Sequence, residues 1–483
     1  MKKYKTTIGL EIHAELKTET KMFCDCKNNP DEKRPNFNVC PICLAHPGTL
    51  PAINKQAVKN VLKVGLAVGG QLADWTEFDR KNYFYPDIPK GYQISQYKYP
   101  LVAGGELKGV EITRVHLEED TARSSHNNGD YSLIDFNRAG VPLMELVTEP
   151  IIKTAQQAGD FARELQLLLR YLGVSDANME KGEMRVEANI SVSVDGDKLG
   201  TKVEVKNLNS FRVVEKAIDY EMKRQIESLE NGEKIIQETR GWNDASQKTF
   251  SQRIKEESED YRYFPDPDLP KLQISEISEF QADELKKEIP ELPQEKRERY
   301  RVEFGVKDED IESFAQDTVL ANFFEKVVSY FASDKNAIKL ASNYITSDLA
   351  GLIKGVRQQP EAELDGSQAV QLGLLTADNF AQLIALAKDK KISSRGAKDI
   401  LSIMYLEGGR PEEIAKTHNL FQESDEGELQ KIIERVIAEN SAVVVEYKNG
   451  KETALKYLIG QGMKISCGSA NPEKIAELLK GNI

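Results

Sequence analysis

The chain has 483 residues, of which 40% are hydrophobic and 30% charged, and its formal net charge at pH 7 is −13. The length allows roughly two to four domains with cores of their own, and no apolar run approaches the about 18 residues that a membrane-spanning helix needs. The acidic balance argues against a general affinity for polyanions, although a local basic groove could still bind nucleic acid. The basic N-terminus is followed by polar strand residues instead of the apolar core of a signal peptide, so we expect a cytoplasmic protein without a membrane segment.

The first informative segment runs from Gly9 to Leu16 and alternates apolar and polar residues, which predicts a β-strand. Its polar face carries Glu11, His13 and Glu15. Two carboxylates beside an imidazole could bind a divalent metal, or one carboxylate could hold the imidazole in place. Taken alone, the segment favours an edge strand with a hydrated polar face. Carboxylates further along the chain shift the balance toward a metal site.

Four of the five cysteines follow next, as Cys24-x-Cys26 and Cys40-x-x-Cys43. This spacing suits one tetrahedral zinc site and does not suggest a disulfide framework in a chain of this length. We therefore predict a structural zinc ion, in preference to four reduced thiols without a metal. Four protein ligands would close the site and leave no coordination position for chemistry.

A core-facing helix is predicted from about Asn54 to Gly69, and the segment from Asp79 to Gln96 then mixes proline, glycine and aromatic residues. Such a composition favours an ordered loop over a regular element. Its aromatic rings and cations could stack on a nucleoside and neutralise phosphate. The alternative is a loop whose rings only cover the core. The residues concerned are Arg80, Lys81, Tyr83, Phe84, Tyr85 and Lys90.

Two further strands carry carboxylates. Residues 111–116 alternate and run into three successive acids at 118–120, and residues 143–149 form a strand with Glu145 and Glu149 on one face. Acids at a strand end repel one another unless a cation or solvent relieves them, and a buried carboxylate needs a metal or an arginine. These acids are candidates to join Glu11 and His13 at a cation.

The chain then predicts a capped helix from Thr154 to Gly173, two paired strands at 184–192 and 201–206, and a long helix from Ser210 to about Gly232. The polar sides of the two strands carry Arg185, Glu187, Asn189, Lys202, Glu204 and Lys206. From about residue 290 helix follows helix, with Gly408–Pro411 as a hinge. Basic, glycine-containing loops at 449–451 and 464–472 could contact a sugar–phosphate backbone, or could be ordinary solvated turns.

Six longer motifs occur in order, and on them the chain resembles the GatB family, the B subunits of bacterial aspartyl/glutamyl-tRNA(Asn/Gln) amidotransferases. The resemblance covers essentially the whole chain. The motifs are Gly9–His13, Asp79–Pro86, His116–Asp120, Asp135–Arg138, Lys206–Phe211 and Asp260–Pro265. Three positions depart from the family's usual residues: Ala45 replaces Gly in the zinc loop, Thr121-Ala122-Arg123 replaces Ala-Gly-Lys, and Glu187 replaces a frequent Asp. Arg123 keeps the charge of lysine but not its point-charge geometry, which leaves the detailed phosphate contacts open.

The resemblance implies an α+β fold in three parts. Residues 1–292 would form a cradle-shaped domain, built on antiparallel sheet with helices, that holds the kinase/transamidase site and a zinc loop at 24–43. Residues 293–407 would form an all-α helical domain, and residues 408–483 a YqeY-like helical tail that binds tRNA. The implied enzyme is a carbon–nitrogen ligase with glutamine as amido donor. It uses ATP to phosphorylate the side-chain carboxylate of misacylated Glu-tRNA(Gln) or Asp-tRNA(Asn), and ammonia then displaces the phosphate.

The resemblance also implies residue roles. Magnesium ligands would be Glu11, His13, Glu119 and Glu145. From the chemistry of phosphoryl transfer we add, as our own candidates for phosphate contact, Arg80, Lys81, Arg138, Arg185, Lys202 and Lys206, with Tyr83 and Tyr85 packed near the site. Phosphoryl transfer needs metal and cations to offset anionic oxygens and needs no protein nucleophile. The chain has no P-loop motif, so the nucleotide must be held in another way.

No amidase-like Gly/Ser-rich signature with a catalytic Ser and Lys occurs, and no cysteine resembles a glutaminase nucleophile. Ammonia would therefore come from a different chain, which the resemblance implies is the amidase (A) subunit, clamped by the small (C) subunit in a heterotrimer. Two alternatives stay open: a non-catalytic tRNA-binding scaffold with structural zinc, and a stand-alone small-molecule carboxylate kinase. The choice between tRNA(Gln) and tRNA(Asn) depends on the synthetases of the cell and not on this chain.

Overall fold

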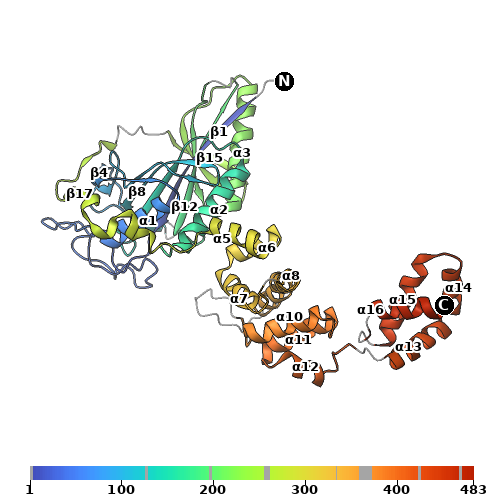
Figure 1. The fold of residues 1–483 in the computed structure, drawn as a ribbon. Helices are drawn as coiled ribbons and strands as arrows, with labels where there is room; N and C mark the ends of the chain where they lie inside the picture. Colours follow the sequence, from blue (N-terminus) through green and yellow to red (C-terminus); the bar gives the residue numbers. More distant parts are fainter. Residues whose placement is uncertain are drawn as a thin grey trace. The chain divides into compact units, whose positions relative to one another are not determined.

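The computed structural model describes residues 4–125, 129–194, 198–254, 261–332, 334–357, 372–422, 426–466, 470 and 472–483. The chain divides into two compact units, Met1–Pro293 and Gln294–Ile483. The first unit combines a sheet with helices and the second contains helices (Figure 1), so the predicted α+β class is confirmed. Within the described ranges, the helices are all too short or too polar to cross a membrane.

The first unit is built on one large sheet. Among the described residues it has ten strands in the order β15-β14-β13-β12-β1-β11-β8-β6-β2, with β7 beside β8. Neighbouring strands are antiparallel except for β13 and β14. The strands are β1 Lys5–Glu15, β2 Gln71–Leu72, β6 Val102–Ala103, β7 Glu106–Leu107, β8 Val110–Glu119, β11 Pro142–Thr148, β12 Met184–Ser193, β13 Val203–Leu208, β14 Glu238–Asn243 and β15 Lys248–Ile254.

Strand β1 lies in the middle of this sheet. It pairs with β12 on one side and β11 on the other, so the edge-strand interpretation is wrong. Its alternation holds as predicted: Leu10, Ile12 and Ala14 are fully buried in the core, whereas Glu11 and His13 are partly exposed on the opposite face. A central strand satisfies its backbone on both sides, and its polar face must then be stabilised by side chains of neighbouring strands.

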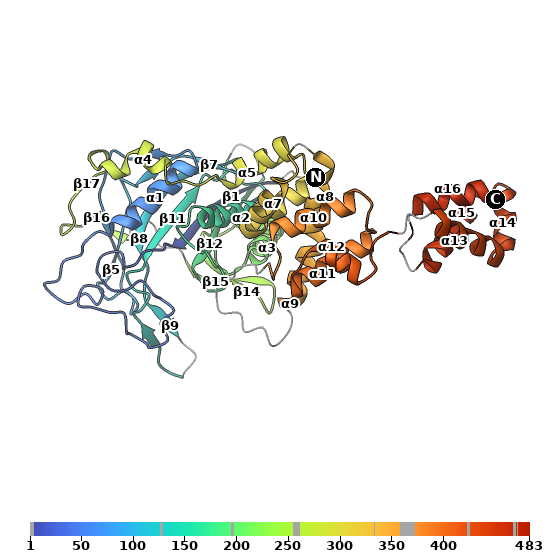
Figure 2. The ribbon, with the colours of Figure 1, turned by 60° about the horizontal axis from the view of Figure 1, so that its bottom comes forward.

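Three helices cover the apolar face of the sheet (Figures 1 and 2). They are α1 Lys55–Ala67, α2 Ala155–Tyr171 and α3 Phe211–Glu230. Each begins at a predicted cap, where the side chain of Asn54, Thr154 or Ser210 accepts a backbone N–H of the first turn. With the helices on one side, the other face of the sheet is left to its polar side chains.

The segment 79–96, predicted as a loop, contains a short hairpin instead. Strand β4 (Asp79–Asn82) pairs with β5 (Tyr92–Ser95), and β16 (Phe264–Pro265) pairs with β4 on its other side. Pro86, Pro89 and Gly91 all lie in the connection, so the turn residues dominated the composition of the segment. The remaining short strands of the unit are β3 Trp75–Thr76, β9 Arg123–Ser125, β10 Leu133–Asp135 and β17 Leu272–Gln273.

The second unit contains two apolar clusters. One includes Tyr300, Phe324 and Phe380, and the other includes Leu429 and Leu458. The α-helices from the end of the first unit onward are α4 Ala282–Lys286, α5 Pro293–Arg299, α6 Asp308–Gln316, α7 Thr318–Val328, α8 Lys335–Asn343, α9 Ala350–Arg357, α10 Ala377–Lys388, α11 Ser394–Glu407, α12 Pro411–Thr417, α13 Glu426–Glu439, α14 Ser441–Lys448, α15 Glu452–Ile465 and α16 Pro472–Asn482.

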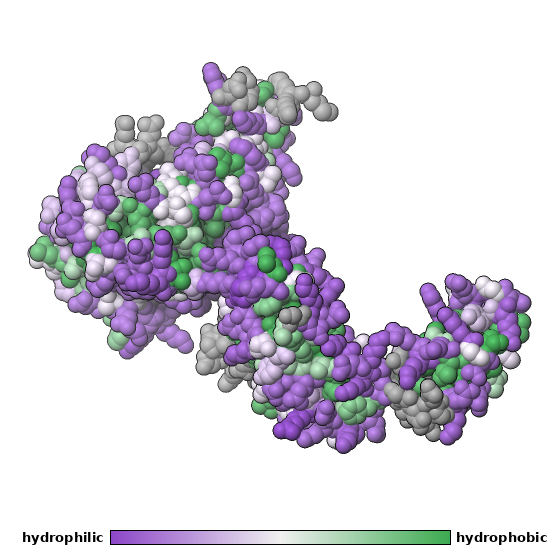
Figure 3. All heavy atoms as spheres, in the orientation of Figure 1, coloured by the Kyte–Doolittle hydropathy of each residue, from purple (hydrophilic) through white to green (hydrophobic). Residues whose placement is uncertain are grey.

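The predicted domain boundaries at 292/293 and 407/408 stay predictions. Helix α12, which lies beyond the second of them, packs against α10 and α11. Figure 3 shows a surface that is hydrophilic over most of the visible face, with hydrophobic residues in small scattered groups.

Candidate functional site

The polar face of the sheet carries a row of facing side chains from three strands. Strand pairing sets His13 on β1 opposite Glu145 on β11, and Glu145 opposite His116 on β8. Nε2 of His13 lies 3.4 Å from Oε2 of Glu145 and 3.5 Å from Oε1 of Glu118. Nε2 of His116 lies 3.2 Å from Oε2 of Glu145. Directly opposed residues on adjacent strands share a face, which is why strands distant in sequence can build this group.

Burial and charge act against each other in this group. Burial alone would lower the pKa of His13, but its hydrogen bond to Glu145 and the attraction of Glu145 and Glu118 raise that pKa to about 9. Burial likewise disfavours the charge of Glu145, yet His116 and His13 hold the pKa of Glu145 well below its usual range. The two carboxylates therefore favour the charged form of the His13 imidazole.

Lys81, on strand β4, also faces this group. Burial would lower its pKa, but attraction from Glu118, together with Tyr263 and Glu145, raises it above the usual lysine value. Its Nζ lies 5.2 Å from the ring centre of Tyr261. A cation held among two buried acids and tyrosine rings is well placed to meet an incoming anion.

A second acidic group lies beside the first. It consists of Glu11, Glu187 and Glu204 from three adjacent strands. Burial, followed by repulsion from Glu145 and from the other two acids, raises the pKa of Glu11. Lys206 lies nearby, with its Nζ 2.7 Å from Glu187 and 4.0 Å from Glu204. Three repelling carboxylates beside one lysine have a deficit of positive charge, which a divalent cation would supply.

Both groups have the donors of a metal site. In each, three ligand atoms lie within 4.8 Å of one another, and over the described part of the chain only one other group of histidines, cysteines and acids is this close. Carboxylate oxygens are the ligands that Mg²⁺ prefers, and a neutral imidazole can complete the first group directly or through water. The residues therefore fit divalent cations on this face.

Glu119 does not lie with His13 and Glu145. It follows Glu118 on β8, and successive strand residues point to opposite faces. Its Oε1 lies 2.6 Å from Nζ of Lys90 and accepts the N–H of Ile94 at 3.0 Å. The structure thus places Glu118, not the predicted Glu119, in the first acidic group. The period of two from His116 was the sequence signal that could have identified Glu118.

Other predicted residues divide between the two faces. Arg80 lies on the far side of β4, where its guanidinium is 2.8 Å from both Asp266 and Asp268. Arg185 lies opposite His13 on β12 and is 2.9 Å from Asp120, to which Arg138 is also close at 3.7 Å. The pKa of Asp120 is lowered despite its burial, chiefly by Arg185.

The other residues that we predicted near the phosphates do not all lie in one place. Tyr83 is partly buried near Lys81, whereas Tyr85 is 60% exposed and Phe84 82% exposed. The last two rings therefore do not cover the core. Lys202 lies just before β13. The structure thus brings Lys81, Tyr83 and Lys206 to the acidic face and leaves Arg80 away from it, while the exposed ring of Tyr85 lies 6.3 Å from that of Tyr83.

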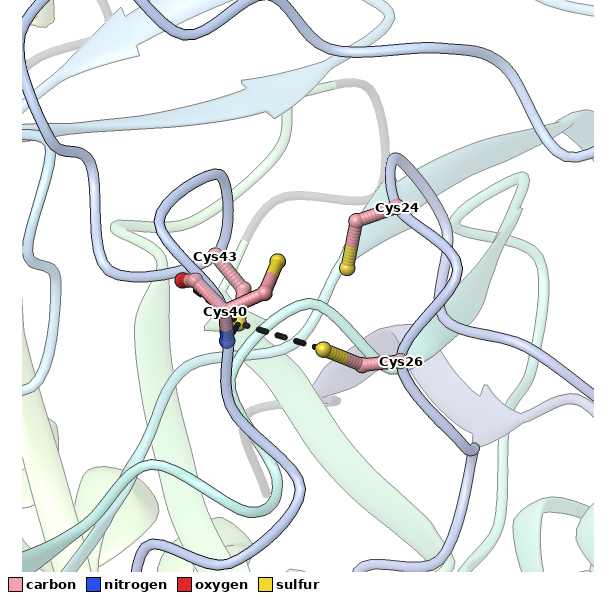
Figure 4. A group of neighbouring side chains, drawn as sticks. All are labelled: Cys24, Cys26, Cys40 and Cys43. Carbon is pink, nitrogen blue, oxygen red and sulfur yellow. Dashed lines mark hydrogen bonds between the residues drawn. The ribbon is translucent and has the colours of Figure 1, made fainter.

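The four cysteines form the third group. Figure 4 shows Cys24 and Cys26 on one loop segment and Cys40 and Cys43 on another, with their sulfur atoms turned toward one another. Sγ of Cys26 and Sγ of Cys43 are 4.0 Å apart, close to the about 3.8 Å expected between thiolates around one tetrahedral zinc ion. A hydrogen bond from Cys24 and the nearby Lys21 ammonium lower the pKa of Cys43 to about 5. The cluster is compatible with zinc.

Comparison with known proteins gives a consistent result over the whole length. Residues 6–278 match the family model described as the GatB/GatE catalytic domain, and residues 322–483 match the one described as the GatB domain. A protein of Gloeothece citriformis is 42% identical, with 99% of this chain and 97% of that protein covered. A protein of Caldanaerobacter subterraneus is 43% identical, with 99% of each covered. Both are named as the B subunit of aspartyl/glutamyl-tRNA(Asn/Gln) amidotransferase.

Proposed function

Because this chain belongs to the GatB family of aspartyl/glutamyl-tRNA(Asn/Gln) amidotransferase B subunits, we propose that it activates the side-chain carboxylate of a misacylated aminoacyl-tRNA with ATP. The family makes the protein part of a tRNA-dependent amidotransferase, a ligase of protein biosynthesis. We propose Glu-tRNA(Gln), Asp-tRNA(Asn) or both as substrates, with Gln-tRNA(Gln) and Asn-tRNA(Asn) as products.

The reaction needs an activation step because a carboxylate is a poor electrophile. In the proposed step a carboxylate oxygen attacks the γ-phosphorus of ATP and ADP leaves. Ammonia then attacks the acyl carbon and phosphate departs. The first step brings anionic oxygens together, and the second develops negative charge on the acyl oxygen and on the departing phosphate. The protein must therefore supply positive charge and exclude water.

The polar face of the sheet is the single observation that supports this site best. We propose that His13, Glu118 and Glu145 hold a divalent cation such as Mg²⁺, which when bound offsets charge on the phosphoryl oxygens. Glu11, Glu187 and Glu204 provide the donors for a second cation. Lys81 would contact a phosphoryl oxygen directly, because its ammonium already faces Glu118 and Glu145.

We propose a narrower set of phosphate contacts than the sequence suggested. Lys206 and Arg185 lie on the acidic face, and Arg138 lies beside Arg185 through their shared neighbour Asp120. Lys202 stays a candidate. Arg80 is held by Asp266 and Asp268 on the other side of β4, so we assign it to holding the hairpin.

The other predicted parts follow from the family. We propose that zinc bound by the four cysteines stabilises their loop, and that the C-terminal helices contact tRNA. Ammonia would be supplied by the amidase partner, assembled with this chain and the small third partner in a heterotrimer. These assignments explain why a chain with candidate kinase groups has no amidase signature.

The proposal is tested by phosphate release from ATP in the reconstituted heterotrimer. With Glu-tRNA(Gln) present, the wild type should release phosphate, and Glu145→Gln should lose most of this activity while glutaminase activity survives. A scaffold without catalysis would tolerate Glu145→Gln, and a stand-alone carboxylate kinase would release phosphate without charged tRNA. Either of these two results would refute the proposal.

A further inference from the structure

A pocket of about 440 Å³ lies in the first unit next to the hairpin of β4 and β5. Its lining mixes tyrosines with cations, the combination that proteins use to bind unpaired nucleotides. The tyrosines are Tyr97, Tyr99 and Tyr263, and the cations are Lys98, Arg262 and Lys271, the last of which is paired with the lining residue Glu77 at 3.4 Å.

The pocket adjoins the acidic face. Asp79 lines the pocket, and Lys81, two residues further along β4, points to the same face and approaches Glu118. On the facing strand β5, Oγ of Ser95 donates to Oε2 of Glu118 at 3.0 Å. Tyr263 belongs to both places, because it lines the pocket and interacts with Lys81.

Tyr97 provides a platform inside this pocket. Its ring stacks on the ring of Tyr263, with centres 4.4 Å apart and planes at 13°. Its backbone N–H donates to Oδ2 of Asp79 at 2.9 Å, which fixes its position at the end of β5. Tyr97 is nevertheless 53% exposed, so a flat ring can extend the stack from the open side.

The substrate of the proposed reaction requires a nucleoside close to the metal-binding face. The reacting carboxylate of a misacylated tRNA is joined to the terminal ribose through only the amino acid and its ester bond. When the carboxylate is at the acidic face, the terminal base must lie nearby. The exposed Arg262 and Lys98 at the pocket would then face the phosphate that precedes this nucleoside.

We propose that this pocket binds the 3′-terminal adenosine of the misacylated tRNA, with its base stacked on Tyr97. This inference rests on the proposed function. A purine could also be supplied by ATP, and the experiment separates the two sources.

The test is a coupling measurement in the reconstituted heterotrimer. Affinity is measured for uncharged tRNA(Gln) and for the same tRNA lacking its terminal adenosine, with wild type, Tyr97→Ala and Tyr97→Phe. Wild type and Tyr97→Phe should lose about tenfold in affinity when the adenosine is removed. Tyr97→Ala should bind both RNAs equally, since its stacking partner is already gone. The matched control is Tyr131→Ala, which removes a tyrosine that is 60% exposed elsewhere in the unit and should behave as wild type.

The KM for ATP, measured in parallel, tests whether the pocket instead holds the adenine of ATP. If Tyr97→Ala still loses the wild-type factor on removal of the adenosine, the pocket does not hold the tRNA terminus and the inference is wrong. If Tyr97→Ala gives that result and its KM for ATP is about tenfold higher than that of wild type, the pocket holds the adenine of ATP instead. The two RNA affinities are measured without turnover, so a chain that failed to activate carboxylates would still show whether the pocket holds the tRNA terminus.

Discussion

Nε2 of His116 lies 3.2 Å from Oε2 of Glu145, while Nδ1 of the same buried ring has no hydrogen-bond partner among the described residues. The ring therefore acts through one nitrogen, and its N–H at Nε2 orients the carboxylate that we assign to the metal. Outer partners of this kind fix the geometry of a ligand and tune its affinity for the ion.

The first prediction separates that role from simple packing. In His116→Gln the amide nitrogen replaces Nε2 and can still donate to Glu145, whereas the shorter side chain in His116→Asn cannot reach. We expect Mn²⁺ affinity to fall about tenfold or more in His116→Asn and to be largely retained in His116→Gln. Titration followed by electron paramagnetic resonance measures both. Equal losses in the two variants would show that His116 only fills space.

The second prediction concerns zinc. Cys43→Ser removes one of four ligands. We expect the metal content, measured by inductively coupled plasma mass spectrometry, to fall from about one zinc per chain to near zero. The melting temperature of the first unit should fall by several degrees, as it should when the wild type is treated with a chelator. A wild-type protein that contains no zinc after purification in zinc-replete medium would contradict the assignment.

The third prediction concerns the packing of α1 on the sheet. Alanine normally stabilises a helix relative to glycine by about 1 kcal/mol. A Cβ added at Gly65, however, would meet Cγ2 of Val102 at 2.5 Å, and the branched valine cannot move aside without shifting β6. We therefore expect Gly65→Ala to lower the free energy of unfolding by about 1–3 kcal/mol. The two tryptophans, Trp75 and Trp242, both lie in this unit, so urea unfolding followed by their fluorescence reports it. Unchanged or increased stability would refute this packing.

The fourth prediction concerns pH and the helical unit. Oε1 of Glu325 accepts the hydroxyl of Tyr300 at 2.7 Å and the guanidinium of Arg299 at 2.7 Å. Burial opposes its charge, but these partners lower its pKa below the ordinary 4.5. A depressed pKa stabilises the fold above the unfolded value, and that stability is lost as pH falls through the folded value. The stability advantage of wild type over Glu325→Gln should thus shrink as the pH is lowered from 7 to below 4.5. Hydrogen exchange of α7 peptides in urea measures it, and an advantage that does not change with pH would contradict it.

The sequence predicted which residues share a face but not where the strands lie. The alternation of 10–15 assigned Leu10 and His13 to opposite faces correctly because side-chain direction in a strand is a local property. The central position of β1 depends on β11 and β12, which are far away in sequence. Similarly, the β4–β5 hairpin was overlooked because its proline-rich connection is longer than its strands.

The choice between Glu118 and Glu119 shows the limit of a motif. The resemblance assigned Glu119 to the metal, yet Glu118 and Glu119 are both buried and both contact cations or donors. They differ in the alternation of side chains along β8, because Glu118 shares the face of His116 and Glu119 does not. Counting by two from His116 would have selected Glu118 without the structure.

The measurement that tests this account most directly is Mn²⁺ binding by Glu118→Gln and Glu119→Gln in the reconstituted heterotrimer. Both substitutions remove one charge from neighbouring residues of one strand, so each controls for the other. The account predicts that Glu118→Gln lowers the affinity for Mn²⁺ about tenfold or more and that Glu119→Gln lowers it less than about twofold. A larger loss in Glu119→Gln than in Glu118→Gln would contradict the assignment of the metal to the face of His13 and Glu145.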